Sequence, residues 1–127
     1  MRVATTVLVT TLAAGVASGP AHAEGDVGKG EMIFKRCSAC HEVEADANGI
    51  GPHLFGIVGR TVASVGGYKY SEGMKSYAAN GEVWDIARLD RYLTNPKETV
   101  KGTKMSFRGL NEDSQRTDVI AYLATLK

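Results

Sequence analysis

The sequence predicts a small all-α domain. From residue 24 onward no stretch of strand length alternates apolar and polar residues, and no repeat or low-complexity segment occurs. Instead, apolar residues at helical spacing follow residues that favour helix N-termini, namely Asp26, Ser71 and Asp85. Frequent glycines between these segments indicate turns. The pattern therefore favours one domain of short helices joined by irregular loops.

Residues 1–23 have the layout of a secretory signal peptide. A single cation, Arg2, precedes an uncharged stretch that ends in Ala21-His22-Ala23. The stretch is short and rich in Thr, Gly and Ala for a membrane span, although an uncleaved anchor is the alternative. Cleavage after Ala23 would leave a single domain, 24–127, with 14 basic and 14 acidic residues, since only Arg2 is lost. This neutral balance argues against a nucleic-acid binder, and we expect a soluble domain exported to the periplasm.

The first helix is predicted over residues 28–36, with Asp26 as its capping residue and Phe34 on its apolar side. The segment 42–67 contains six glycines and is predicted to form loops and turns.

Ser71 is predicted to cap a second helix that runs to about Ala79 and ends at Asn80-Gly81. Asp85 then caps a helix over residues 86–93. This helix must stop near Asn95-Pro96, because a residue that precedes proline disfavours the helical conformation.

A brief helical turn is predicted to follow through Lys101 and to end at Gly102. The last helix is predicted from Asn111 to about Leu126, with Glu112 and Asp113 in its first turn. Its apolar positions at helical spacing are Val119, Ile120, Leu123 and Ala124.

The only two cysteines stand in the pentapeptide Cys37-Ser38-Ala39-Cys40-His41. A disulfide would close a very small loop and constrain the unfolded chain little. A zinc site would need a fourth ligand such as His53, and adjacent Cys40 and His41 fit one tetrahedron poorly. A redox dithiol would require a strand before the motif. Cys-x-x-Cys-His is the attachment sequence for c-type haem, with the cysteines on two vinyl groups and His41 beneath the iron.

A haem held in this way leaves one axial position on the iron, and four side chains are candidates for it. Met32 lies too close to Cys37 along the chain and is expected to pack in the core. Met74 is expected at the surface or partly buried, and His53 to be solvated or hydrogen-bonded. Met105 lies on a segment that contains Pro96 and Gly102 and can extend across the far face of the ring.

Several stretches together resemble the class I c-type cytochromes, in particular mitochondrial-like cytochrome c and its bacterial periplasmic, photosynthetic-type relatives. They are GDVGKGEMIFKRCSACH, GPHLFGIVGR, GYKYS, Trp84, YLTNPKETVKGTKMSF and RTDVIAYL. The resemblance implies about five helices around one covalently attached haem c, with the first and last helices crossing. It implies that Gly30 and Phe34 meet Val119 and Tyr122 at the crossing. It also makes His41 and Met105 the two iron ligands.

The resemblance assigns further roles one residue at a time. Pro52 is similar to the residue whose carbonyl accepts the imidazole N–H of the ligand histidine. The groups that resemble the surroundings of the haem propionates are Arg60, Tyr70, Trp84 and, more weakly, Tyr68. The polar groups that resemble those near the methionine and inner propionate are Tyr92, Thr103 and Asn80.

The function implied is that of a soluble, monomeric one-electron carrier rather than an enzyme. A quinol-oxidising complex would donate electrons, and an oxidase, a reaction centre or a reductase would accept them. Alternatives are a haem protein with a labile sixth ligand that binds small molecules or acts as a peroxidase, and a dedicated subunit of one enzyme. The cations that could form a positive rim around the haem edge are Lys35, Arg36, Lys97, Lys101, Lys104 and Arg108.

Overall fold

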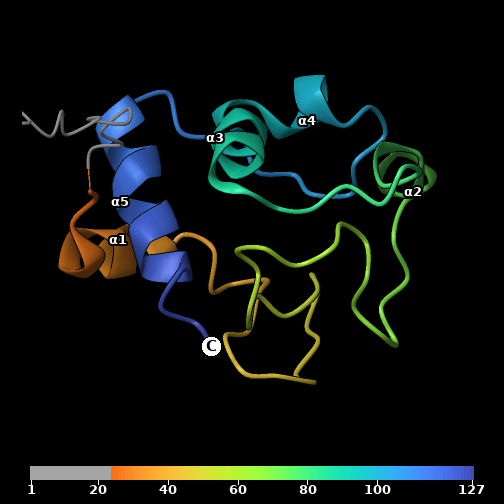
Figure 1. Cartoon of the computed structure of the whole chain (residues 1–127), viewed down its shortest axis with the longest axis horizontal. Helices are drawn as coiled ribbons and strands as arrows, with labels where there is room; N and C mark the ends of the chain where they lie inside the picture. Colours follow the sequence, from red (N-terminus) through yellow and green to blue (C-terminus); the bar gives the residue numbers. More distant parts are fainter. Residues whose placement is uncertain (1–23) are drawn as a thin grey trace, which may run out of the picture.

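The computed structural model describes residues 24–127, so the expected signal peptide lies outside the described residues. Residues 24–127 form five helices joined by irregular loops (Figure 1), and extended pairing among these residues is limited to one antiparallel bridge, Thr61 with Val83. The all-α prediction is confirmed. The helices are α1 (Val27–Phe34), α2 (Glu72–Tyr77), α3 (Ile86–Thr94), α4 (Pro96–Thr99) and α5 (Asp113–Leu123).

The helix starts follow from local capping chemistry. In each predicted cap, a side-chain oxygen accepts a hydrogen bond from a backbone N–H that lacks a partner inside the helix. Asn95 caps α4 in the same way, immediately before Pro96 at the first helical position. At the three predicted caps, the side chain of Asp26 accepts from the Lys29 amide, that of Ser71 from the Met74 amide, and that of Asp85 from the Arg88 amide.

Four helices, α1, α2, α4 and α5, end earlier than predicted, because the chain tightens into turns with hydrogen bonds three residues apart. After α1, the amide of Cys37 donates to the carbonyl oxygen of Phe34. After α5, the amide of Leu126 donates to the carbonyl oxygen of Leu123. α2 stops at Tyr77 instead of Ala79. α5 also begins at Asp113 rather than Asn111, because Glu112 is extended and makes no side-chain cap.

The crossing of α1 and α5 joins the two ends of the described chain (Figure 1). Gly30 lies so close to α5 that a Cβ there would stand 2.0 Å from the Asp118 carbonyl oxygen, so only glycine fits. The rings of Phe34 and Tyr122 lie 5.2 Å apart, and Val119 is 1% exposed. The predicted crossing is therefore confirmed.

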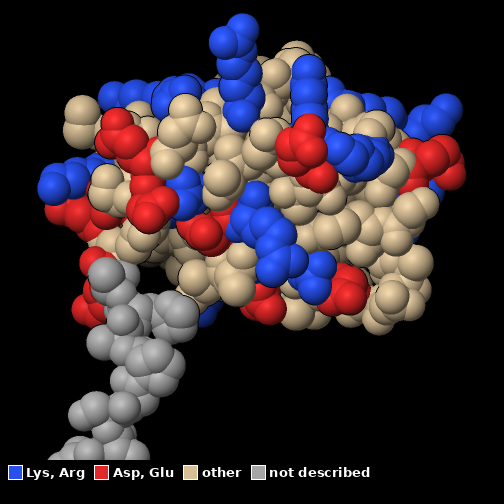
Figure 2. Space-filling model, turned by 90° about the horizontal axis from the view of Figure 1, so that it is seen from above, with Lys and Arg blue, Asp and Glu red and all other residues tan. Residues whose placement is uncertain are grey.

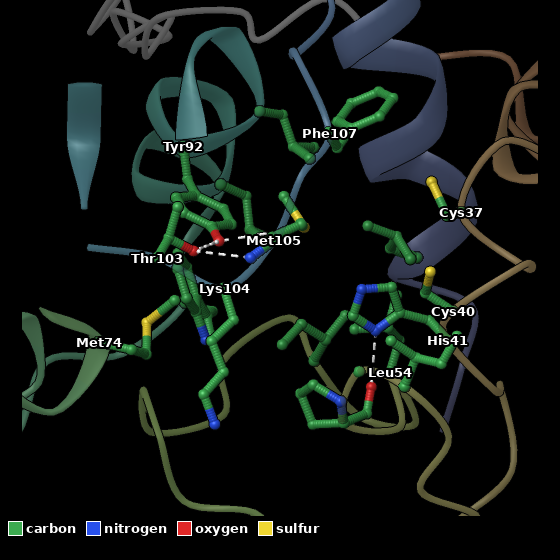
Figure 3. Close-up of a pocket in the computed structure, with 18 of the residues that line it drawn as sticks. Cys37, Cys40, His41, Leu54, Met74, Tyr92, Thr103, Lys104, Met105 and Phe107 are labelled. Carbon is green, nitrogen blue, oxygen red and sulfur yellow. Dashed lines mark hydrogen bonds between the residues drawn. The ribbon is translucent and has the colours of Figure 1, made fainter. Parts of the chain in front are cut away.

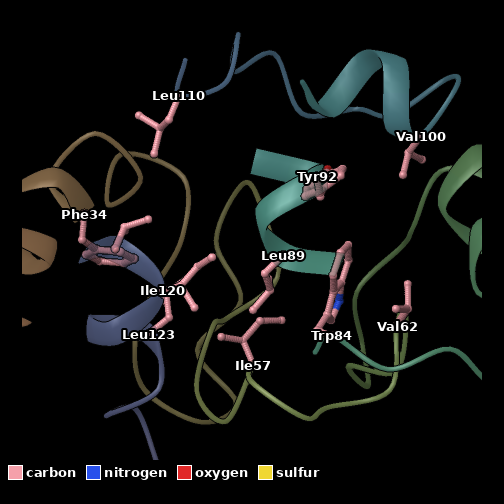
Figure 4. Packing of buried hydrophobic residues seen from close by; sticks show 11 residues of the cluster. Phe34, Ile57, Val62, Trp84, Leu89, Tyr92, Val100, Leu110, Ile120 and Leu123 are labelled. Atoms are coloured by element: carbon pink, nitrogen blue, oxygen red, sulfur yellow. The ribbon is translucent and has the colours of Figure 1, made fainter. Parts of the chain in front are cut away.

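The apolar core runs from this crossing to α3 and the loops beside it (Figure 4). Its members include Ile57, Trp84, Leu89, Tyr92, Val100, Leu110, Ile120 and Leu123. Burial of each such side chain stabilises the fold by about 1.5–3 kcal/mol relative to exposure.

A buried cation, Arg116 on α5, ties three parts of the fold together. Its Nε donates to Asp90 on α3 at 2.7 Å, and one Nη donates to the carbonyl oxygens of Leu110 at 2.7 Å and Asn111 at 3.1 Å. These bonds satisfy the guanidinium and hold the segment that leads into α5 against the core.

Backbone hydrogen bonds fix the long loop before α2 against the residues that precede α3. Val62 donates to Glu82, Trp84 donates to Arg60, and Gly59 donates to Trp84. This pairing brings Arg60 and Trp84 to the same side of the core. Among residues 24–127, no helix has the length and apolar character needed to cross a membrane.

Candidate haem site

A cavity of about 430 Å³ opens in the core between α5, α3, α2 and the long loops. Cys37, Cys40, His41 and Met105, predicted from separate parts of the sequence, all line it. Figure 3 shows the His41 ring and the Met105 side chain reaching into it from different segments. The cysteines and both predicted iron ligands therefore share one site.

The Cys-x-x-Cys-His segment folds as a helical turn. The amides of Cys40 and His41 both donate to the Cys37 carbonyl oxygen at 3.0 Å, which brings both thiols and the imidazole to the cavity wall. Both thiols are free. Burial raises the pKa of the Cys37 thiol, and the nearby Arg36 opposes that shift. In residues 24–127 no cluster of three or more His, Cys, Asp or Glu side chains could hold a metal ion, so the zinc alternative finds no site.

The backbone around Pro52 sets the orientation of the His41 ring. Nδ1 lies 2.7 Å from the Pro52 carbonyl oxygen, which can only accept, so Nδ1 carries the hydrogen. A Cβ on Gly51 would stand 2.4 Å from Cε1 of His41, so only glycine lets the ring lie this close. Burial lowers the pKa of His41, although the bond to Pro52 opposes the shift. The ring is therefore neutral, and its unprotonated Nε2 is free to bind a metal.

A small polar network holds Met105. Its backbone N–H donates to Thr103 Oγ1 at 3.3 Å, and the Tyr92 hydroxyl lies 3.2 Å from the same oxygen. The Tyr92 hydroxyl also donates to Met105 Sδ at 4.0 Å. Burial raises the pKa of Tyr92, so the hydroxyl keeps its proton and remains a donor.

Arg60 and Tyr70 make one part of the cavity wall suitable for carboxylates. The two Nη atoms of Arg60 donate to the carbonyl oxygens of Phe55 and His53, but its Nε is buried with no partner among residues 24–127. The Tyr70 oxygen accepts a bond from the Val65 amide, and burial raises the pKa of Tyr70, so its own proton is available. An unpaired buried donor is costly, and an anionic group in the cavity would satisfy it.

The other expected propionate neighbours, Tyr68 and Trp84, also line the cavity. The Tyr68 hydroxyl donates to the Ile50 carbonyl oxygen at 3.0 Å, so that proton is already used. Trp84 packs against Tyr92 with ring centroids 5.1 Å apart. Asn80, in contrast, is exposed and does not line the cavity.

The structure corrects the expectation for Met32 and refines those for Met74 and Lys104. Met32 is 68% exposed rather than packed in the core, because α1 turns Gly30 and Phe34 inward and Met32 lies on another face. Met74 and Lys104 both line the cavity. Met74 was expected at the surface or partly buried and Lys104 in the rim around the haem edge, and their exact place in the wall depends on distant segments.

The residues present fit a haem c. Two thiols on one turn can form the thioether bonds, and an imidazole nitrogen and a thioether sulfur are accepted iron ligands. The unpartnered Nε of Arg60 and the Tyr70 hydroxyl suit the propionates, and apolar side chains such as Leu54 and Phe107 surround the rest of the cavity.

Comparison with known proteins gives the same family throughout. The family model described as "Cytochrome c" matches residues 27–127. A cytochrome c2 of Rhodomicrobium vannielii is 49% identical over 114 residues, which cover 89% of each chain. A c-type cytochrome cy of Rhodobacter capsulatus is 51% identical over 108 residues, and the match spans 84% of this chain but about half (52%) of that relative.

A solved structure, cytochrome cH from Methylobacterium extorquens, has the same fold. Its TM-score is 0.73 at 42% sequence identity, and the match covers 80% of this chain and 99% of the other. Together with the free Cys-x-x-Cys-His turn and the cavity behind it, these matches show that the chain belongs to the cytochrome c family, as an electron-transfer protein with haem c bound covalently through Cys37 and Cys40.

Proposed function

We propose that the protein is a one-electron carrier of the periplasm whose haem iron is held by His41 and Met105. The observation that carries this proposal is the meeting of the two side chains in one cavity, although they come from segments far apart in the chain. The bound haem supplies the chemistry, since its iron exchanges one electron between the ferric and ferrous states.

The chain would assist by fixing both ligands and excluding water. Pro52 orients His41, and the bond that it accepts makes the imidazole a better donor. The soft sulfur of Met105 favours ferrous iron and raises the reduction potential. The apolar wall acts in the same direction, because low polarity disfavours the additional charge of the ferric state.

Arg60 and Tyr70 are the residues that we assign to the propionates, with Trp84 and Tyr68 beside them. The cation and the phenol would offset the cost of burying carboxylates. Thr103 and Tyr92 would hold the Met105 loop through the bonds described above.

Partners are proposed to dock at the haem edge through a small, transient interface. All six cations expected in the rim around this edge are exposed, and two of them, Arg36 and Lys104, line the cavity. On the face in Figure 2, Lys and Arg side chains are interspersed with Asp and Glu. Arg36 and Lys104, exposed at the cavity, would steer acidic partner surfaces weakly and in a salt-dependent way. The partners proposed are a quinol-oxidising complex as donor and an oxidase, reaction centre or reductase as acceptor.

We further propose that the mature protein is a monomer made of residues 24–127. The signal-like segment ends at Ala23, and the cap of α1 follows at Asp26. Cleavage after Ala23 would therefore leave the folded domain starting close to its new N-terminus. The N-terminal sequence of protein purified from the periplasmic fraction tests this, and a retained Met1 would contradict it.

Axial ligation is tested by exposing the reduced holoprotein to carbon monoxide and recording the haem absorption spectrum. We expect no change in the wild type, because Met105 occupies the sixth position. In Met105→Ala we expect rapid carbon monoxide binding. A rapid shift in the wild type would overturn the proposal and favour a ligand-binding or peroxidase role.

A further inference from the structure

Helix α2 lies against the turn that precedes Met105. If Gly73 carried a Cβ, that atom would stand 1.8 Å from the carbonyl oxygen of Lys101 and 2.9 Å from its carbonyl carbon. An ordinary carbon–oxygen contact is about 3.3–3.6 Å, so a methyl group there would force the two backbones apart by roughly 1.5 Å. No side chain is available to move aside, because the opposing atoms are backbone.

The turn opposite Gly73 is rigidly connected to Met105. Val100 anchors it in the core at 1% exposure, and the Thr103 amide closes it by donating to the Val100 carbonyl at 3.1 Å. Gly102 supplies a positive φ of 75° within the turn. Since the Met105 amide bonds to Thr103 Oγ1, a displacement of Lys101 is passed on to the sulfur-bearing residue.

The residues just before α2, Tyr68 and Lys69, make a second contact with the Met105 loop. Lys104 Nζ donates to the carbonyl oxygen of Lys69 and lies 5.9 Å from the centre of the Tyr68 ring. Met74, next to Gly73, lines the cavity (Figure 3). Residues 68–74 therefore support the loop from outside and also form part of the cavity wall.

We propose that Gly73 is a positioning residue for the sixth ligand: its missing side chain lets α2 dock on Lys101 and hold Met105 against the iron. This inference rests on the proposed ligation by Met105. A protein with a larger residue at this position would keep its haem but leave the sixth position open to small ligands. The group displaced by the added methyl would be the ligand itself.

The test compares Gly73→Ala with two glycine controls in the holoprotein. Gly66→Ala adds the same methyl where no atom lies within 4 Å, and Gly30→Ala adds it against the Asp118 carbonyl at the distant helix crossing. The readouts are the ferric methionine–iron charge-transfer band, the rate of carbon monoxide binding to the ferrous protein, and chemical unfolding.

Gly73→Ala is expected to lose most of the charge-transfer band and to bind carbon monoxide much faster than the wild type. Gly66→Ala should match the wild type. Gly30→Ala should unfold more easily but keep its band, which separates loss of ligation from general loss of stability. A Gly73→Ala protein with an unchanged band and unchanged carbon monoxide binding would overturn the inference.

Hydrogen exchange on the wild-type protein keeps the inference testable if Gly73→Ala does not accumulate. The Thr103 amide should exchange together with the α2 amides of Lys75 and Ala78, because both sets depend on the same docking contact. If α2 exchanges while Thr103 stays protected, docking does not hold the loop. Absence of the charge-transfer band in the wild type would instead refute ligation by Met105, so the two failures are distinguishable.

Discussion

The hydroxyl group of Tyr92 donates a hydrogen bond to the sulfur of Met105 across 4.0 Å. A donor on this sulfur withdraws electron density and so favours ferrous iron when the thioether is a ligand. We expect Tyr92→Phe to lower the reduction potential by about 20–60 mV, from a net hydrogen-bond contribution of about 0.5–1.5 kcal/mol. Spectroelectrochemical titration would measure the change.

Tyr122→Phe is the matched control for this substitution. Tyr122 packs against Phe34 at the crossing of α1 and α5, away from Met105, so loss of its hydroxyl should leave the potential unchanged. Equal shifts in both variants would mean that the Tyr92 hydroxyl acts only through general stability.

Lys104 is the residue best placed to replace Met105 on the iron at alkaline pH. It lines the cavity one residue before Met105, whereas Lys101 lies outside the cavity and pairs with Glu98 at 3.0 Å. A neutral amine can bind iron, but a guanidinium cannot. We therefore expect Lys104→Arg, which keeps a donor for the Lys69 carbonyl, to move the loss of the methionine–iron band to higher pH.

Lys101→Arg should leave that alkaline midpoint where it is in the wild type. Persistence of the band in the wild-type protein at high pH would show that no lysine displaces Met105. A shift with Lys101→Arg alone would assign the replacement to the other lysine.

The buried guanidinium of Arg116 is expected to contribute substantially to stability. Arg116→Lys cannot reach Asp90 and the Leu110 and Asn111 carbonyls together, so acceptors that include the buried Leu110 carbonyl lose their partners. We expect a loss of about 2–4 kcal/mol in the free energy of unfolding, measured with denaturant. The bond to Asp113 adds little, since that side chain is 92% exposed. Arg91→Lys on exposed α3 surface should change stability by less than about 0.5 kcal/mol.

Ala63 holds a left-handed backbone conformation, with φ at 56°, in the turn that precedes Val65. This conformation costs an L-residue about 1–2 kcal/mol, while glycine loses about 0.5–1 kcal/mol more entropy than alanine on folding. Ala63→Gly should therefore stabilise the fold by about 0.5–1 kcal/mol in thermal or chemical unfolding. Asp46→Gly, at a similar φ of 64°, should gain less, because aspartate tolerates this conformation better. Destabilisation by Ala63→Gly would show that the lost methyl contact outweighs the relieved strain.

Local chemistry made much of the fold predictable. The caps at Asp26, Ser71 and Asp85 depend on residues within one helical turn, so each helix start could be read from neighbouring positions. The attachment motif is equally local, since the turn that carries Cys37 and His41 closes within five residues. The family resemblance added the pairing of distant segments, including the contact between Phe34 and Tyr122.

Contacts made across the chain were not predictable in the same way. The need for glycine at position 73 depends on a carbonyl 28 residues away, and nothing beside Gly73 indicates that neighbour. Arg116 likewise bonds to Asp90 on another helix, so a charged residue became part of the core. Met32 was misplaced because an apolar residue type does not by itself fix which side of a short helix faces inward.

The crossing of α1 with α5 has a consequence for the order in which the protein is made. The Asp26 amide bonds to the Asp118 carboxylate, 92 residues later, so the first helix has no packing partner until synthesis is nearly complete. Closure of so long a loop also delays folding of a small domain. The Cys37–His41 segment directly follows that first helix. We therefore expect the two thiols to remain accessible for haem attachment until α5 docks, and the docking of α5 to be the step that encloses the cofactor.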